Sequence, residues 1–364
     1  MRRTTIVVIF FVLIAAIVIG ISQFLQSQPP VEFTAVINPL AESWLRDSIN
    51  RFNDTQPVVG ATQRIQFNIV VMDDLPIWQG GTNYTPENHP AVWIATSGAS
   101  VDYADRYTVR VPSLARTPLV WGGYGNRVEI AAAATGGVFD WQAVQNAASA
   151  QRWDALPGGQ SGWGFVNLAF TQPNMTMSGL GTLLMGAASY HNSGDLSGNA
   201  VRDPGFRSWM QPIIASVPNF QTLGSDPAAA VARGPATAAM ALLPENLWLN
   251  NLRGLTDSES FTFSYPAYQF MLDFPLAVWN GPVTDLERQA VQALADWLMQ
   301  PAQQARTVNS GLRPAAAEPD ETAALFTAAE SFGIQRQPDY GTPVQAPSRT
   351  EAAALLQWFT NISR

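Results

Sequence analysis

The sequence predicts an α/β fold with a mainly parallel sheet, and three features of the 364-residue chain support this class. Short runs of buried-type apolar residues, which are typical of strands, recur along the chain. Segments whose apolar residues return at helical spacing lie between these runs, and such alternation is the pattern of βαβ units. The length corresponds to about two domains at roughly 150 residues each. We therefore expect two α/β units.

The first predicted unit starts close to residue 32. A strand is expected over 32–37 (EFTAVI) and a helix over 41–52 (AESWLRDSINRF), whose apolar residues fall on one face. Asn38 and Pro39 join the two elements. Further buried-type strands are expected over 67–72, 91–94 and 119–121.

The second predicted unit occupies the middle of the chain. Helices are expected over 140–150 and 179–190, with a strand over 163–170 between them. The later predicted elements are helices over 206–217, 227–233, 284–298, 301–309 and 349–359, and a strand over 238–243. The segment 315–347 is rich in alanine, proline and aspartate, and we expect it to wrap over the surface.

The chain begins with a segment of membrane character. Residues 6–21 (IVVIFFVLIAAIVIGI) carry no charge, and at 1.5 Å per residue they cover about 24 Å, so flanking residues extend the predicted membrane segment to 6–25. Arg2 and Arg3 precede it, whereas the next basic residue is Arg46, so the positive-inside rule places the bulk of the chain outside the cytoplasm. We expect residues 1–30 to be an anchor and spacer of a single-pass membrane protein; a cleaved signal peptide, which would release the chain, is the alternative.

Composition excludes several classes of function. The chain has no cysteine and no lysine, which removes thiolate, disulfide, P-loop and Schiff-base chemistry. Its 20 basic and 28 acidic residues give a net charge of −8, which disfavours nucleic acid as a partner. His89 and His191 belong to no metal motif, and GGQSGWG at 158–164 lacks the final glycine of a nucleophile elbow. We therefore expect no enzymatic activity, no metal site and no cofactor.

Six short segments resemble the type II extracytoplasmic solute-binding proteins, the receptors of ABC importers. The segments are PAVWIATSGASVD at 90–102, LARTPLV at 114–120, PNMTMSGLG at 173–181, ARGPATAAMALLPENL at 232–247, YPAYQFMLDFP at 265–275 and LADWLMQPAQQARTVNSGLRP at 294–314. Their order and spacing are most similar to the molybdate- and sulfate-like receptors, and particularly to the receptor-like half that some bacterial proteins fuse to a von Willebrand factor A domain. This chain carries no D-x-S-x-S motif of such a domain.

The resemblance implies the two-lobe periplasmic-binding-protein type II fold, with a hinge of two crossing strands near 118–122 and 268–274. Lobe I would comprise 31–118 together with 272–364, and lobe II would comprise 119–271. In this family the ligand lies between the lobes. The resemblance thus implies a receptor that closes on a small molecule.

The predicted ligand-binding residues are Asn38, Ser97, Thr117, Thr176, Ser178 and Tyr265. The resemblance places the family's hydroxyl ligands on Ser97, Thr117 and either Thr176 or Ser178. Ser, Thr and Asn also begin helices everywhere, so ordinary capping is the alternative for each. Relatives more often carry serine at the position of Asn38; because an amide both donates and accepts, a neutral polar ligand is as consistent as an oxyanion. Tyr265 either closes over the ligand or packs at the hinge.

Two functions fit these observations. The first is a membrane-anchored receptor that captures an oxyanion or small polar solute for an ABC-type importer or sensor, and the twelve tryptophans keep a sugar or quaternary amine open as the solute. The second is an envelope protein–protein interaction module that retains the fold and works with a separate von Willebrand factor A-type partner. The first predicts a polar cleft and a moving hinge, and the second predicts a filled cleft.

Overall fold

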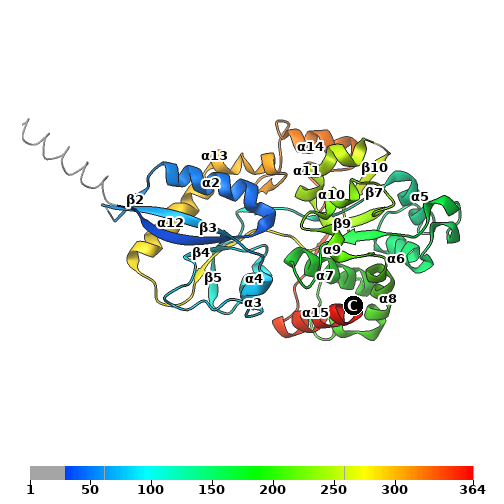
Figure 1. Cartoon of the computed structure of the whole chain (residues 1–364), viewed down its shortest axis with the longest axis horizontal. Helices are drawn as coiled ribbons and strands as arrows, with labels where there is room; N and C mark the ends of the chain where they lie inside the picture. Colours follow the sequence, from blue (N-terminus) through cyan, green and yellow to red (C-terminus); the bar gives the residue numbers. More distant parts are fainter. Residues whose placement is uncertain (1–28, 61, 258, 364) are drawn as a thin grey trace, which may run out of the picture.

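The computed structural model describes residues 29–60, 62–257 and 259–363 (Figure 1). The predicted membrane segment 6–25 lies outside these residues. Among the residues that are described, no helix is both long enough and apolar enough to cross a bilayer.

The first sheet has six strands in the order β2-β3-β1-β4-β12-β5, and we call the body around it lobe I. β1 pairs in parallel with both β3 and β4, whereas β12 returns antiparallel between β4 and β5. The strands are β1 (Val31–Ile37), β2 (Val58–Val59), β3 (Gln63–Val71), β4 (Val92–Ile94), β5 (Tyr107–Val111) and β12 (Leu276–Trp279). The helices of this lobe are η1 (Pro39–Ala41), α2 (Glu42–Asp54), α3 (Leu75–Trp78), α4 (Gly98–Tyr103), α12 (Asp285–Leu298), α13 (Pro301–Gln304) and η5 (Thr307–Ser310).

The second sheet has four strands in the order β10-β7-β9-β8, and the body around it is lobe II (Figure 1). Its strands are β7 (Leu119–Tyr124), β8 (Leu168–Phe170), β9 (Met240–Pro244) and β10 (Phe261–Ser264). Its helices are α5 (Gly125–Ala133), α6 (Trp141–Ala150), η2 (Trp153–Ala155), η3 (Ser161–Trp163), α7 (Met177–His191), η4 (Ala200–Arg202), α8 (Pro204–Ala215), α9 (Phe220–Leu223), α10 (Pro227–Val231) and α11 (Glu245–Thr256).

The prediction of an α/β fold is confirmed, but the prediction of mainly parallel sheets is wrong. In lobe II only β8 and β9 are parallel, because β7 enters from the hinge end while β9 runs back toward it. In lobe I, β12 is antiparallel because the chain returns through it from lobe II. The predicted strand over 163–170 is also too long, since a 3-10 turn precedes the short strand β8.

Three segments of the chain run side by side between the sheets, and we call them the hinge strip. β6 (Ala115–Arg116) pairs antiparallel with β13 (Arg313–Pro314). Thr117, on the other side, pairs with Leu272; the Thr117 N to Leu272 O distance is 2.8 Å. The prediction of two crossings misses β13, and it places the first crossing too late, because the apolar run after residue 118 is β7 of lobe II.

One residue of the hinge strip has an unusual backbone conformation. Phe274 is fully buried and has a φ of +44°, in the left-handed region that residues with side chains rarely adopt. Its amide donates to Thr96 O and its carbonyl accepts from Leu114 N, so the surrounding chain holds this conformation. Such strain concentrates where a structure must switch or bind.

The C-terminal part of the chain wraps over both lobes. Its elements are α14 (Ala324–Ala329), η6 (Glu330–Phe332), β14 (Thr342–Pro343) and α15 (Arg349–Ile362), and β14 pairs with β11 (Tyr268–Gln269). α14 contacts both α11 of lobe II and η5 of lobe I, and α15 contacts η4 of lobe II. The predicted lobe boundaries stay a proposal, which we amend by grouping residues from about 315 onward with lobe II rather than with lobe I.

Candidate functional site

Polar residues follow three neighbouring strands of lobe I at the edge that faces lobe II. Asn38 follows β1, Asp73 and Asp74 follow β3 after Met72, and Ser97 begins α4 after β4. The carboxyl ends of parallel strands meet at one edge of a sheet, and binding sites of α/β proteins form there. The order of the strands therefore brings these side chains together.

Asp74 is the centre of this edge. Its side chain is fully buried and accepts hydrogen bonds from Asn38 Nδ2 (3.3 Å), Thr96 N (2.7 Å) and Ser100 Oγ (2.5 Å). Asn38 Nδ2 also contacts Thr96 Oγ1 at 2.5 Å. One carboxylate thus ties together the turns that follow β1, β3 and β4.

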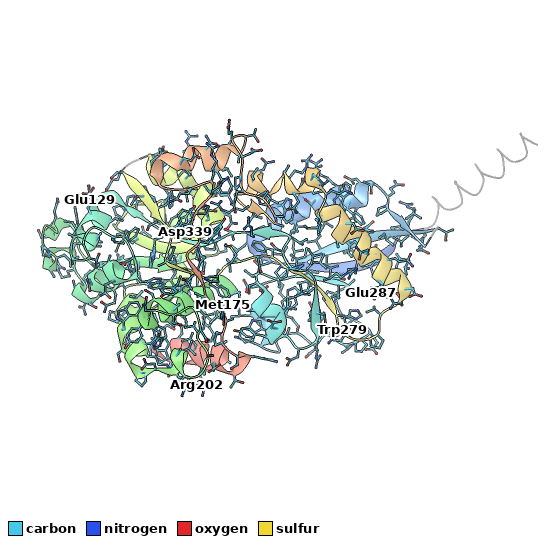
Figure 2. The ribbon with its side chains drawn as sticks, turned by 180° about the vertical axis from the view of Figure 1, so that it is seen from behind. Glu129, Met175, Arg202, Trp279, Glu287 and Asp339 are labelled. Atoms are coloured by element: carbon cyan, nitrogen blue, oxygen red, sulfur yellow. The ribbon has the colours of Figure 1, made fainter. Side chains whose placement is uncertain are left out.

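Asp73 reaches across to lobe II. Its Oδ1 atom accepts from the amide of Met177, the first residue of α7, at 3.3 Å. Thr176 caps the same helix through Gly179 N (3.1 Å), and Met175, which precedes it, is exposed near the boundary between the lobes (Figure 2). The amino end of a helix attracts negative charge. Asp73 therefore takes, from the opposite lobe, a position that suits an anion.

A second direct contact joins the lobes beside the hinge strip. Asn246, in the first turn of α11, donates from Nδ2 to Leu40 O at 2.9 Å. The backbone amide of Asn246 donates to Thr117 Oγ1 at 3.1 Å, and the Thr117 hydroxyl donates to Asn246 Oδ1 at 3.3 Å. Together with the contact of Asp73, this means that the two lobes touch directly, and we call this arrangement closed.

A third carboxylate, Asp273, lies in the hinge strip next to Phe274 and accepts from Gly98 N at 3.2 Å. Burial raises the pKa of Asp73 to about 7, with a further contribution from the charge of Asp74. Burial likewise raises the pKa of Asp74 to about 6 against the opposing effect of its hydrogen bonds, and that of Asp273 to about 6. The hydrogen-bond partners described for these three carboxylates, which we call the acidic edge, are all neutral groups.

Five of the six predicted site residues lie where the two lobes face each other or in the hinge strip. Ser97 is 3% exposed and its Oγ atom has no hydrogen-bond partner, whereas Ser178 Oγ contacts Thr171 Oγ1 at 2.9 Å. Asn38, Thr117 and Thr176 make the contacts given above. Whether any of them binds a solute stays a prediction.

Tyr265 lies apart from the other five. Its hydroxyl donates to Glu245, the first residue of α11, and lies 3.2 Å from Arg313 Nη2. Arg313 and Glu245 are fully buried and form a bidentate pair, with Nε to Oε2 at 2.6 Å and Nη2 to Oε1 at 2.8 Å. Arg313 also pairs with Glu318 at 2.7 Å. This Arg313 cluster fastens the third crossing to lobe II, which is a structural role.

Sequence reasoning missed the acidic edge and Asn246. Asp73 and Asp74 directly follow the predicted strand over 67–72, and Asp273 lies in a predicted crossing, so their positions at strand ends could have identified them. Asn246 was inside a recognised segment, but nothing in its residue type indicated a contact with lobe I. Among the described residues, no group of three or more His, Asp and Glu side chains could hold a metal ion.

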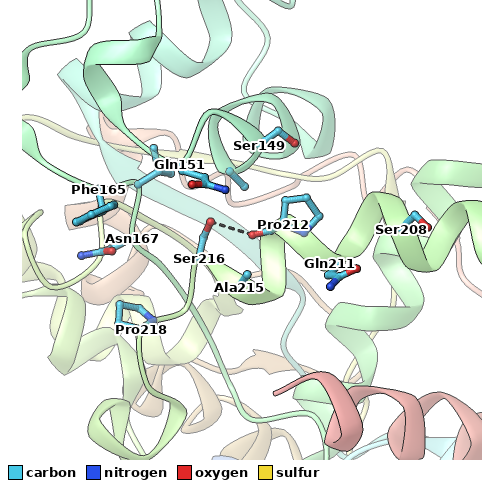
Figure 3. A pocket seen from close by; sticks show the side chains of 12 residues that line it. Ser149, Gln151, Phe165, Asn167, Ser208, Gln211, Pro212, Ala215, Ser216 and Pro218 are labelled. Carbon is cyan, nitrogen blue, oxygen red and sulfur yellow. Dashed lines mark hydrogen bonds between the residues drawn. The ribbon is translucent and has the colours of Figure 1, made fainter. Parts of the chain in front are cut away.

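A pocket of about 610 Å³ lies elsewhere, on lobe II between α6 and α8 (Figure 3). Phe165, Asn167 and Ser216 are among its lining residues, and Ser216 Oγ donates to Pro212 O at 2.9 Å. Figure 3 shows these side chains around an open recess, and none of them belongs to the predicted site.

Comparison with known proteins shows a likeness in structure only. No family model and no curated protein matches the sequence. The iron-bound protein HitA from Pseudomonas aeruginosa has a TM-score of 0.60 at 12% identity, with 92% of this chain and 100% of that chain covered. UgpB from Mycobacterium tuberculosis, in complex with glycerophosphocholine, has a TM-score of 0.59 at 13% identity, with 92% and 97% covered. The sulfate-binding protein SubI from Mycobacterium tuberculosis H37Rv has a TM-score of 0.51 at 13% identity, with 89% and 96% covered.

The predicted link to von Willebrand factor A fusion proteins finds no support in these matches. Similar solved structures carry different ligands, and likeness at this level of identity concerns the fold. The described residues of this chain have the two-lobe α/β fold of type II periplasmic solute-binding proteins.

Proposed function

We propose that the protein is an extracytoplasmic solute-binding receptor that closes its two lobes on a small solute and serves an ABC-type importer or a sensor. The observation that carries this proposal is the set of buried polar side chains that face each other from both lobes beside a strained hinge. Thr117 belongs to the hinge strip, Asn246 to lobe II and Asn38 to lobe I, and all three are buried. Ligand sites occur preferentially at the interface between two domains, where a few placed polar groups fix the orientation of the ligand.

The acidic edge favours a solute without net negative charge. An oxyanion would lie close to three carboxylates that have only neutral partners, and such repulsion is strong where water is excluded. An ammonium group or a hydroxyl-rich compound would instead donate hydrogen bonds to them. Of the two expected solute classes, we therefore favour a neutral polar or cationic solute over an oxyanion. Ser97, whose buried hydroxyl has no hydrogen-bond partner, has spare hydrogen-bonding capacity for such a solute.

Thermal unfolding of the full chain in a mild detergent, in the presence of a panel of compounds, tests this proposal. Choline, polyols, amino acids, sulfate and molybdate are each added at millimolar concentration. A compound at a hundredfold excess over its Kd stabilises the fold by about 2.7 kcal/mol, which moves the midpoint by several degrees. We expect shifts from a cationic or neutral class and none from the oxyanions.

Two variants sharpen the panel. Ser97→Ala should abolish the shift while leaving the midpoint of the free protein unchanged, and Ser43→Ala, at an exposed position on α2, is the matched control. Stabilisation by sulfate or molybdate would contradict the proposed solute class. A shift that survives Ser97→Ala would place the solute elsewhere.

We further propose that the chain is held at the cell membrane through residues 6–25, with its bulk extracytoplasmic. The support is the uncharged apolar run and the arginines that precede it. Those residues lie outside the described part of the chain. The similar solved structures include a periplasmic binding protein, P5PA, which is consistent with an extracytoplasmic location.

A second candidate function is supported by the contacts that fill the cleft. Asp73 already occupies the amino end of α7, and Asn246 already binds Leu40 O, so polar groups of the two lobes satisfy each other. A protein that retained the receptor fold as an envelope interaction module would have such a cleft, and a von Willebrand factor A-type partner stays a prediction. This candidate is favoured if no compound of the panel shifts the unfolding midpoint of well-folded protein.

A further inference from the structure

The C-terminal segment passes from lobe II to lobe I and back. β14 lies beside β11, and Gln345 N donates to Gly194 O at 2.8 Å, both on the side of lobe II. Two residues later the chain reaches lobe I, where the hydroxyl of Tyr103 on α4 donates to Pro347 O at 2.8 Å. The chain then enters α15. The segment therefore bridges the lobes independently of the hinge strip.

The first turn of α15 is held by lobe I. The guanidinium of Arg349 donates to the carbonyl oxygen of Trp78, at the end of α3, and pairs with Asp105 at 2.9 Å between Nη1 and Oδ2. Ser348 and Glu351 form a capping box, which fixes where the helix begins. The amino end of α15 is thus placed against lobe I by polar contacts.

The remainder of α15 is anchored in lobe II. Leu355 and Phe359 are fully buried, and the Phe359 ring lies 5.3 Å from that of Phe220. Asn174 Nδ2, from the loop that leads into α7, donates to Thr360 Oγ1 at 3.2 Å. In Figure 1 the helix runs from the side of α3 and α4 to the side of α8, below the strands that connect the lobes.

The two ends of α15 are held with unequal strength. Burial of large apolar side chains is the main stabilising contribution in proteins, whereas exposed ion pairs contribute little. The side chains of Arg349 and Asp105 are 45% and 75% exposed. A cavity of about 440 Å³ lies beside the helix, lined by Trp78, Asn174 and Leu356 among others, so α15 does not pack tightly across the boundary. The helix should therefore move with lobe II, and its amino end should separate from lobe I when the lobes open.

We infer that α15 is a latch on the closed arrangement of the lobes, and that Arg349, with Tyr103, sets how often the protein opens. The contact lies away from the hinge strip. Opening of the lobes therefore moves it further than it moves the contacts beside the hinge strip. Opening requires loss of the Arg349 and Pro347 contacts, whereas α15 stays on lobe II. This inference goes beyond solute capture, because it concerns the chain without solute and holds for either proposed function.

Because the chain contains no cysteine, spin labels can be attached at two introduced cysteines without removing any native thiol. Asp54→Cys at the end of α2 and Glu129→Cys on α5 introduce the only two thiols, at exposed positions in different lobes, for spin labels. Pulsed electron paramagnetic resonance of the labelled full chain then reports the distribution of distances between the lobes. We expect a single narrow distribution in the parent protein.

The test variant combines Tyr103→Phe with Arg349→Ala. The control variant is Arg288→Ala, which removes an exposed ion pair within lobe I. The first variant should gain a population at longer distance, with an open-to-closed ratio raised about tenfold or more, since each lost hydrogen bond is worth roughly a factor of five. The control should keep the parent distribution. Unfolding midpoints, recorded in parallel, separate opening from loss of the fold.

An unchanged distribution in the folded double variant would overturn the inference. If that variant does not fold, Arg349→Ala alone keeps the Tyr103 contact and must still give a longer population. No solute is added in this experiment. The absence of midpoint shifts in the compound panel would therefore count against solute binding, whereas an unaltered distance distribution would count against the latch.

Discussion

Two groups of buried acids in this protein differ in their partners. In the Arg313 cluster, Glu245 is matched by a bidentate arginine, and neither side chain is exposed. In the acidic edge, Asp74 is just as buried but has only neutral partners. A buried charge that is fully paired serves the architecture, whereas buried acids without a cation have perturbed pKa values and are candidates for a functional site. By this criterion, the Arg313 cluster has a structural role at the hinge strip, and the acidic edge is the candidate functional site.

The largest effect should come from breaking the compensated cluster. Arg313→Met leaves Glu245 buried without its counter-charge, and such losses cost about 3–5 kcal/mol of unfolding free energy. Urea denaturation of the full chain measures the difference. Arg313→Met combined with Glu245→Leu should recover part of it, because no charge then remains buried. A loss below about 1 kcal/mol in the single variant would show that the cluster does not fasten the hinge.

The acidic edge should make stability depend on pH. Its carboxyls have folded pKa values of about 6 to 7 against 3.8 for the ordinary group, so between these values the folded state binds more protons than the unfolded chain. Their contribution is therefore fully present below about pH 4 and is lost as pH rises to about 7. We expect weaker stability at pH 8 than at pH 5.

The matched variant for this measurement is Asp73→Asn, which cannot titrate and keeps the size of the side chain. It should reduce the fall in unfolding free energy between pH 5 and pH 8, whereas Asp54→Asn on the surface of lobe I should not. Equal slopes in the parent protein and in Asp73→Asn would mean that Asp73 is not buried in solution.

The smallest effects distinguish two serines at the start of α4. Ser100→Ala removes a hydrogen bond to the buried carboxylate of Asp74 and should cost about 1–3 kcal/mol. Ser97→Ala removes a hydroxyl that has no partner, and should change unfolding free energy by less than about 0.5 kcal/mol. Urea denaturation of both variants measures this. A large loss for Ser97→Ala would assign its hydroxyl to the fold rather than to a solute.

Local patterns predicted most of the fold. The alternation from β1 through Asn38 into α2 is strong because both the strand and the apolar face of the helix are buried in lobe I. The predictions fail where distant contacts decide the structure. β13 contains a charged residue, Arg313, and its burial depends on a partner 68 positions away.

The resemblance pointed to Ser97, Thr117 and Ser178, and the structure places Ser97 where lobe I faces lobe II, Thr117 in the hinge strip and Ser178 beside Thr171. Their role in binding stays a prediction. For Tyr265, packing at the hinge was the alternative to closing over the ligand, and its hydroxyl lies beside Arg313 of the hinge strip. The path of α15 across the lobes could not be predicted, because its apolar face indicates burial without indicating which surface covers it.

The central claim is that the cleft takes a solute without net negative charge. Isothermal titration of the full chain with choline, sorbitol and sulfate at equal ionic strength, in the parent protein and in Ser97→Ala, tests it most directly. We predict saturable heat from choline or sorbitol that Ser97→Ala abolishes, and none from sulfate. Saturable binding of sulfate that Ser97→Ala abolishes would contradict the claim.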